Sequence, residues 1–117
     1  MYAKVRVGYE NGAITCDQPE VQLFYLTGPH SVVWVIDEAP PGAAAVMIRW
    51  QGESPFDDIS MSLDGTRLVA TGNRMQRGSF KYSILFFDRT RSVIARLDPV
   101  VANEPDPPGW PEDDDWP

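Results

Sequence analysis

The sequence predicts an all-β protein built as a two-sheet sandwich, and three observations support this prediction. Apolar and polar residues alternate in several short runs, which is the side-chain period of a β-strand. Nine Gly and eleven Pro residues among 117 separate these runs, and together they exceed the usual share of about 12%. No stretch of ten or more residues keeps an apolar repeat at helical spacing. We therefore expect about nine strands in a single domain.

Three runs in the first half of the chain are the clearest strands. Residues 2–9 alternate between apolar and charged side chains, which predicts a half-buried strand. Residues 31–37 are apolar on both faces, with Trp34 on one of them, and this predicts a central strand covered on both sides. Residues 43–50 alternate again and place Trp50 inward. Shorter apolar runs near the N-terminus are expected to add two further strands.

A first hairpin is predicted over residues 58–71. Asp64-Gly65 suits a two-residue turn, because Asp and Gly tolerate the positive φ angles that such turns require. This turn sets Met61 opposite Leu68, and the apolar pattern of the two strands agrees with that register.

A second hairpin is predicted over residues 80–97, with a four-residue turn at 88–91. Pairing Phe87 with Ser92 places Ile84 opposite Ala95 and aligns aromatic and aliphatic side chains on one face.

An immunoglobulin-like Greek-key arrangement is one interpretation of this strand pattern. Trp34 follows Leu23 by eleven residues, and Tyr82 precedes Ile84 by two. Immunoglobulin domains show a similar spacing of Cys, Trp and a Tyr-x-Cys corner, with cysteines where this chain has aliphatic residues. Another Greek-key or jelly-roll arrangement fits the pattern equally well.

The net charge of −7 is concentrated at the end of the chain. The last fifteen residues hold six of the seventeen carboxylates and no Lys or Arg, which leaves a net charge of −1 for residues 1–102. Neither part has the basic footprint of a nucleic-acid-binding protein, so we expect no nucleic-acid partner. No apolar run is long enough to cross a membrane or to act as a secretory signal, which predicts a cytoplasmic protein without a membrane partner.

The residues usually found in enzyme and zinc sites are scarce. His30 is the single histidine and is expected to be a turn residue, since it follows Gly28-Pro29. Cys16 is the single cysteine, and its place in an alternating apolar run predicts a sheltered thiol. A structural zinc site needs four Cys or His ligands, and this chain has only two such residues. We therefore expect no enzymatic activity and no cofactor.

Two carboxylate pairs keep a ligand-binding alternative open. Asp37-Glu38 and Asp57-Asp58 are expected at loop edges, where carboxylate oxygens can bind Ca²⁺. A small-ligand sandwich, binding a carbohydrate or Ca²⁺ through these residues, is thus the alternative to an interaction module.

The segment 97–105, LDPVVANEP, contains two proline breaks six residues apart. Pro99 lacks a backbone N–H, so it is expected at a strand end, an edge or a bulge. Glu104-Pro105 is the second break. Asp98 and Asn103 are expected to hydrogen-bond the local backbone as caps.

This segment resembles the signature of the DP-EP family, small bacterial β-sandwich proteins named after the two dipeptides. It is also distantly similar to the terminal pattern of AidA/PixA inclusion-body proteins. The motif residues are Asp98, Pro99, Asn103, Glu104 and Pro105. The resemblance implies a Greek-key β-sandwich and brings no established biochemical activity with it.

The composition divides the chain into a sandwich domain at 1–102 and a proline-rich acidic tail at 103–117. Such a composition favours disorder unless something anchors it. Trp110 and Trp116 are the expected anchors, since a buried indole contributes about 2–3 kcal/mol. They would dock on the same subunit, on a second copy or on a different protein. The sequence thus predicts a non-enzymatic interaction or self-assembly module, with a homo-oligomer formed through the tail or a sheet edge.

Overall fold

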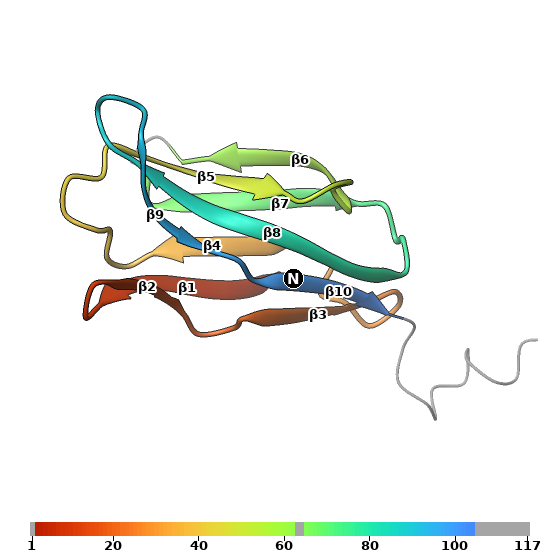
Figure 1. The fold of residues 1–117 in the computed structure, drawn as a ribbon. Coiled ribbons are helices and arrows are strands. Elements are labelled where there is room, and N and C mark those ends of the chain that lie inside the picture. The colour runs from red at the N-terminus through yellow and green to blue at the C-terminus, as the bar shows by residue number, and fades with distance from the viewer. Residues whose placement is uncertain (1, 63–64, 105–117) are drawn as a thin grey trace, which may run out of the picture.

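Ten β-strands in two layers form the described part of the protein (Figure 1). The structure, a computed structural model, describes residues 2–62 and 65–104. Every regular element within these ranges is a strand, so the predicted all-β sandwich is confirmed. The strands are β1 (Ala3–Glu10), β2 (Ala13–Cys16), β3 (Glu20–Phe24), β4 (Val32–Ile36), β5 (Ala45–Trp50), β6 (Phe56–Met61), β7 (Arg67–Asn73), β8 (Gly78–Phe87), β9 (Val93–Leu97) and β10 (Val100–Glu104).

The strands are divided between two mixed sheets. Sheet 1 has the order β2-β1-β4-β7-β6, and sheet 2 has the order β3-β10-β8-β5, with β9 also paired with β8. β1 runs parallel to β4, and β10 runs parallel to β3, whereas the other pairs are antiparallel. The predicted central strand is β4, at the middle of sheet 1. The sequence predicts about nine strands, and β10 is the additional one in the structure.

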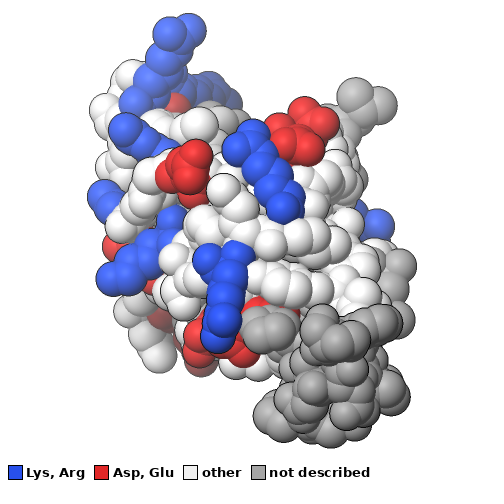
Figure 2. Space-filling view, turned by 90° about the vertical axis from the view of Figure 1, so that its right-hand side faces the viewer, with Lys and Arg blue, Asp and Glu red and all other residues white. Residues whose placement is uncertain are grey.

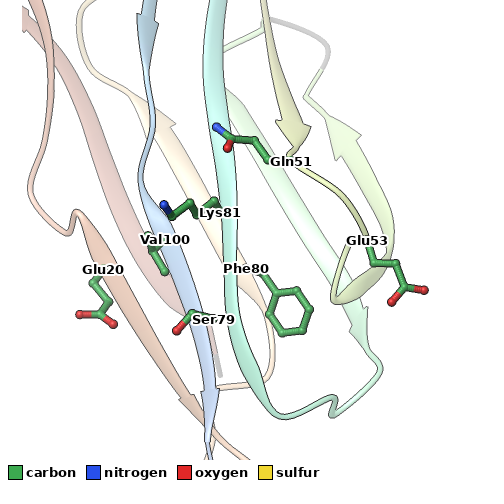
Figure 3. A pocket seen from close by; sticks show the side chains of 7 residues that line it. All are labelled: Glu20, Gln51, Glu53, Ser79, Phe80, Lys81 and Val100. Carbon is green, nitrogen blue, oxygen red and sulfur yellow. The ribbon is translucent and has the colours of Figure 1, made fainter.

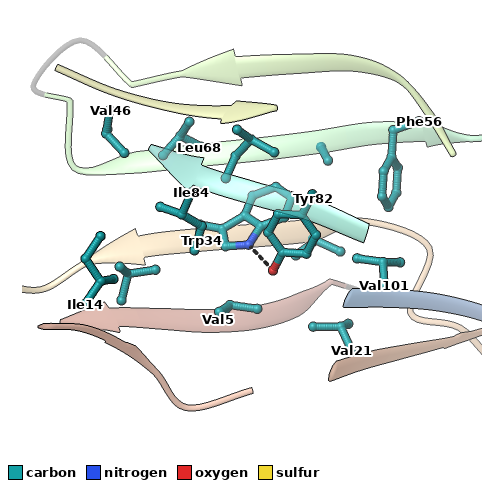
Figure 4. Close-up of a cluster of buried hydrophobic side chains, with 14 of the residues drawn as sticks. Val5, Ile14, Val21, Trp34, Val46, Phe56, Leu68, Tyr82, Ile84 and Val101 are labelled. Carbon is teal, nitrogen blue, oxygen red and sulfur yellow. Dashed lines mark hydrogen bonds between the residues drawn. The ribbon is translucent and has the colours of Figure 1, made fainter. Parts of the chain in front are cut away.

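The core is centred on Trp34 of sheet 1 and Tyr82 of sheet 2 (Figure 4). The indole Nε1 of Trp34 donates a hydrogen bond of 2.9 Å to the Tyr82 hydroxyl, and the two rings meet edge to face at 5.4 Å. The Trp50 ring lies 5.2 Å from Tyr82 and continues the aromatic cluster. The bond across the sheets matters because a buried indole N–H without an acceptor is costly.

These two residues do not form the tyrosine corner of an immunoglobulin domain. There the conserved tyrosine bonds to nearby backbone, whereas the Tyr82 hydroxyl accepts from Trp34 in the opposite sheet. Leu23 and Ile84, expected to replace the inter-sheet cysteine pair, both lie in sheet 2. The predicted sandwich is confirmed, but its Trp, Tyr and aliphatic residues are not arranged as the corresponding residues of an immunoglobulin domain are.

The first predicted hairpin has the predicted register. Met61 pairs with Leu68 and Ile59 pairs with Ala70 between β6 and β7. Asp64 lies outside the described residues, and Gly65 has the expected positive φ of 72°.

The second hairpin corrects the predicted register by two residues. Ile84 pairs with Leu97, not with Ala95, and a β-bulge follows at Phe86/Phe87. The turn differs because the Asp88 carboxylate accepts bonds from the backbone N–H groups of Thr90 and Ser92. An even shift keeps the same side chains facing inward, so the core pattern survives the error.

The sandwich also extends two residues beyond the predicted boundary at 102. β10 runs to Glu104, and Asn103 is fully buried. The described chain ends there, so the predicted tail from residue 105 onward lies outside the described residues.

Candidate functional site

Asp98-Pro99 interrupts what is otherwise one continuous strand beside β8. β9 and β10 pair with β8 in the same register, with Ile84 opposite Leu97 and Lys81 opposite Val100. The Pro99 carbonyl still accepts a bond of 3.1 Å from the Tyr82 N–H. Pro99 lies between the end of β9 and the start of β10, so its expected position at a strand end is confirmed. The strand is interrupted there because proline has no backbone N–H to donate.

The Asp98 carboxylate belongs to a chain of polar side chains on the outer face of sheet 2. Its Oδ1 accepts bonds from Ser83 Oγ at 2.6 Å and from Arg96 Nε at 2.9 Å. Gln51 Nε2 in turn donates to Ser83 Oγ at 3.4 Å. These donors, Ser83 first and then Arg96, lower the pKa of Asp98. The predicted cap of the local backbone is wrong for Asp98, because side chains of neighbouring strands bind it instead.

Asn103 is likewise not a local cap. Its side-chain amide exchanges two hydrogen bonds, of 3.0 and 2.9 Å, with the amide of Asn73 on β7. Since β7 and β10 lie in different sheets, this pair joins the two layers. Glu104 ends β10, and its carbonyl accepts a bond from the Tyr25 N–H. Pro105 lies outside the described residues.

A basic recess lies beside Asp98 on the outer face of sheet 2. It has a volume of about 400 Å³, and its lining includes Arg49, Gln51, Ser83 and Arg96. Arg49 pairs with Ser83 across β5 and β8, and Arg96 comes from β9 on the other side of β8. Two guanidinium groups therefore flank one recess.

A second hollow, of about 550 Å³, lies further along the same sheet (Figure 3). Lys81 and Val100 lie between Glu20 on one side and Glu53 on the other. Its charges are of mixed sign, and the labelled side chains include no cysteine or histidine that could serve as a nucleophile or a proton-transfer base.

Within the described residues, the sandwich is open between β5 and β6. Ile59 and Met61 share the inward face with Leu68 and Ala70, yet they are 36% and 48% exposed. Met47 on β5 is 44% exposed, and a hollow of about 240 Å³ separates the two strands. The core therefore reaches solvent along this side. No local pattern in the sequence could have shown it, because the side is open only through the placement of two strands in different sheets.

The two predicted carboxylate pairs do not form one site. Asp37 binds Arg6 through two bonds of 2.9 and 2.8 Å, and Asp57 binds Arg74 at 2.8 Å. Asp37 follows β4 near the start of β7, whereas Asp57 lies beside the end of β7. Across residues 2–62 and 65–104, no three His, Cys, Asp or Glu side chains come together as metal ligands. Glu38 and Asp58 are exposed.

The two remaining candidate residues in the described ranges, His30 and Cys16, have surroundings that indicate a structural role. His30 Nε2 lies 2.8 Å from the Tyr25 carbonyl, in the segment that leads into β4. Cys16 is half-buried, and this burial raises the pKa of its thiol, so the prediction of a sheltered thiol is confirmed in part. Trp110 and Trp116, the predicted anchors, lie outside the described residues.

Charges of both signs are mixed on the face shown in Figure 2. Lys and Arg side chains alternate with Asp and Glu over the described part of this face, without a continuous basic stripe. Within the described ranges, no helix has the length and apolar character needed to cross a membrane.

No protein-family model matches the chain, and no curated protein matches it either. The geometry of the described residues defines the class: a β-sandwich with an open apolar side and a basic recess on its outer surface.

Proposed function

We propose that this protein is a non-enzymatic self-assembly module that binds a second copy of itself through the open side of the sandwich. The observation that carries the proposal is the exposure of Ile59 and Met61, two side chains on the inward face of an edge strand. Exposed apolar surface of this kind is typical of a protein interface.

The strand edge provides the hydrogen bonds for such an interface. β6 is the last strand of sheet 1, so its outer edge has no neighbouring strand in the described chain. An unpaired edge is a template for an incoming strand. The opposite edge strand, β2, is only four residues long and contacts β9 of the other sheet. The β6 edge is therefore the more accessible of the two.

A second copy fits this edge because the strand is complementary to itself. In an antiparallel pair centred on Ile59, Asp58 faces Ser60 and Asp57 faces Met61, so no two carboxylates oppose each other. Residues 1–102 carry a net charge of only −1, so most of the net charge of −7 belongs to residues 103–117 and not to the strands of the sandwich. The arrangement has two-fold symmetry, which closes as a dimer.

The mass of the full chain in solution tests this proposal. Ile59→Lys would place two ammonium groups opposite each other at the symmetry axis, and we expect it to convert a dimer into a monomer in sedimentation equilibrium. Gln22→Lys is the matched control, because Gln22 is exposed on β3, an edge strand of sheet 2. A wild-type chain that stays monomeric at all accessible concentrations would refute the proposal.

A second variant separates this interface from a tail-mediated one. Assembly through Trp110 and Trp116 is the other interface that the sequence predicts, so the full chain with both residues replaced by Ala is compared with Ile59→Lys. Loss of the dimer in the tryptophan variant alone would contradict assembly through β6. The proposal includes a cytoplasmic location, which the single cysteine supports, since small secreted domains commonly depend on disulfides.

A further inference from the structure

The basic recess on the outer face of sheet 2 has the chemistry of an anion site. We infer that Arg49 and Arg96 bind an oxyanion, a carboxylate or phosphate group, in the recess above Ser83 and Leu85. This inference is independent of the proposed self-assembly, which concerns the β6 edge of sheet 1.

The positions of the two arginines follow from strand pairing. β5 and β9 lie on either side of β8, so they are separated by about 10 Å, twice the spacing between neighbouring strands. Arg49 is opposite Ser83, and Arg96 is opposite Leu85, so the two arginines lie diagonally across β8. Their side chains line the same hollow of about 400 Å³.

The floor of the recess is sheltered from water. Ser83 and Leu85 are only 2% and 5% exposed, although the alternation of β8 directs them to the outer face of the sheet. Longer side chains of the neighbouring strands therefore cover them. A charge interaction above such a floor is stronger than one in open solvent, because fewer water molecules screen it.

The hydrogen-bond pattern leaves the guanidinium groups available. Ser83 donates its hydroxyl proton to Asp98, and Arg96 uses its Nε on the same carboxylate, which leaves its terminal N–H groups unassigned. The guanidinium group of Arg49 forms no ion pair and no side-chain hydrogen bond with another residue in the described ranges. Asp98 thus orients Arg96, and the recess itself is lined by two guanidinium groups and by no carboxylate among the described residues.

The excess positive charge specifies the class of ligand. Arginine binds the paired oxygens of carboxylates and phosphates through two parallel N–H groups, and this geometry favours an oxyanion over a halide. The oxyanion has two available sources. It is either a free small anion or one of the carboxylates at residues 112–115 of this chain.

Calorimetric titration of the full chain with inorganic phosphate tests the inference. We expect Arg49→Gln and Arg96→Gln each to weaken binding by about tenfold or more, since each removes charged hydrogen bonds. Arg77→Gln is the control, because Arg77 is exposed between β7 and β8, away from the recess. Arg49→Lys should fall between the wild type and Arg49→Gln, because it keeps the charge and loses the paired donors.

A variant without the carboxylates at residues 112–115 distinguishes these carboxylates from a free anion as the source of the oxyanion. In the full chain with Glu112→Gln and with Asp113, Asp114 and Asp115 each replaced by Asn, phosphate should bind more tightly than in the wild type if these carboxylates occupy the recess. Equal binding to both chains identifies a free anion as the ligand. The inference is overturned if neither chain binds phosphate, or if Arg49→Gln binds it as well as the wild type does. Thermal unfolding of each variant shows whether it is folded, and Arg49→Gln removes no ion pair or side-chain hydrogen bond of the described residues.

Discussion

The side-chain amides of Asn73 and Asn103 hydrogen-bond to each other in both directions and join the two sheets. Asn103 is fully buried, so each of its polar atoms needs a partner within the protein. Asn73 Oδ1 also accepts a bond from the Met75 N–H, which ties the loop after β7 to the same pair. The asparagine of the DP-EP-like motif thus connects the two layers of the sandwich.

Asn103→Ala should lower the free energy of unfolding by about 1–3 kcal/mol, because it leaves the Asn73 amide without its partner. Urea denaturation measures the change, with the exposed Gln22→Ala on the neighbouring strand β3 as control. The double variant with Asn73→Ala should lose less than the sum of the two single losses. Strictly additive losses would contradict a direct coupling between the two amides.

Tyr82→Phe should destabilise the protein by about 1–3 kcal/mol, because it removes the acceptor of the buried Trp34 indole. Burial raises the pKa of Tyr82. The unfolded chain therefore ionises this residue above about pH 10 while the folded chain does not, and stability falls as the pH rises further. The Tyr82→Phe variant should show a shallower loss of stability in this range, measured by denaturation at a series of pH values. Identical slopes for both proteins would refute the assignment.

Ser83→Ala and Arg96→Gln should each raise the pKa of the Asp98 carboxyl, because the Ser83 hydroxyl is the largest single cause of the lowered value and Arg96 lowers it through both a hydrogen bond and its charge. NMR titration of the carboxyl carbon measures both. A lowered pKa means that the contribution of Asp98 to stability is present above its unfolded-state value and is lost as the pH falls below about 4. An unchanged pKa in either variant would contradict the bond of that donor to the carboxylate.

Gly72→Ala should be more damaging than Gly42→Ala, although both glycines have a positive φ, of 73° and 85°. A Cβ at residue 72 would lie 2.9 Å from the Cβ of Asp57, whereas residue 42 has open space around it. We expect a loss of about 1 kcal/mol at residue 42 from backbone strain alone. At residue 72 we expect a larger loss, and also a weaker Asp57–Arg74 ion pair. Equal melting temperatures for the two variants would contradict the steric explanation.

Much of the strand pattern could be predicted because it depends on near neighbours in the chain. Alternation identified the inward positions Val5 and Val7, and both are fully buried. The Asp64-Gly65 signal predicted the pairing of Met61 with Leu68, since a two-residue turn allows only one register. The register of β8 and β9 could not be predicted in the same way, because a bulge and the bonds of Asp88 set it.

The sequence by itself determined that this is an all-β sandwich, which side chains face inward, and that Pro99 lies at a strand end, an edge or a bulge. These properties follow from side-chain period and from the missing proline N–H, which act over a few residues. Only the tertiary structure decided that Arg49 and Arg96 share a recess, and that Asn103 bonds Asn73. It also decided that Ile59 and Met61 remain exposed. The physical reason is that these relationships depend on which distant strands pair and which sheet each one joins, and local backbone preferences carry no information about that choice.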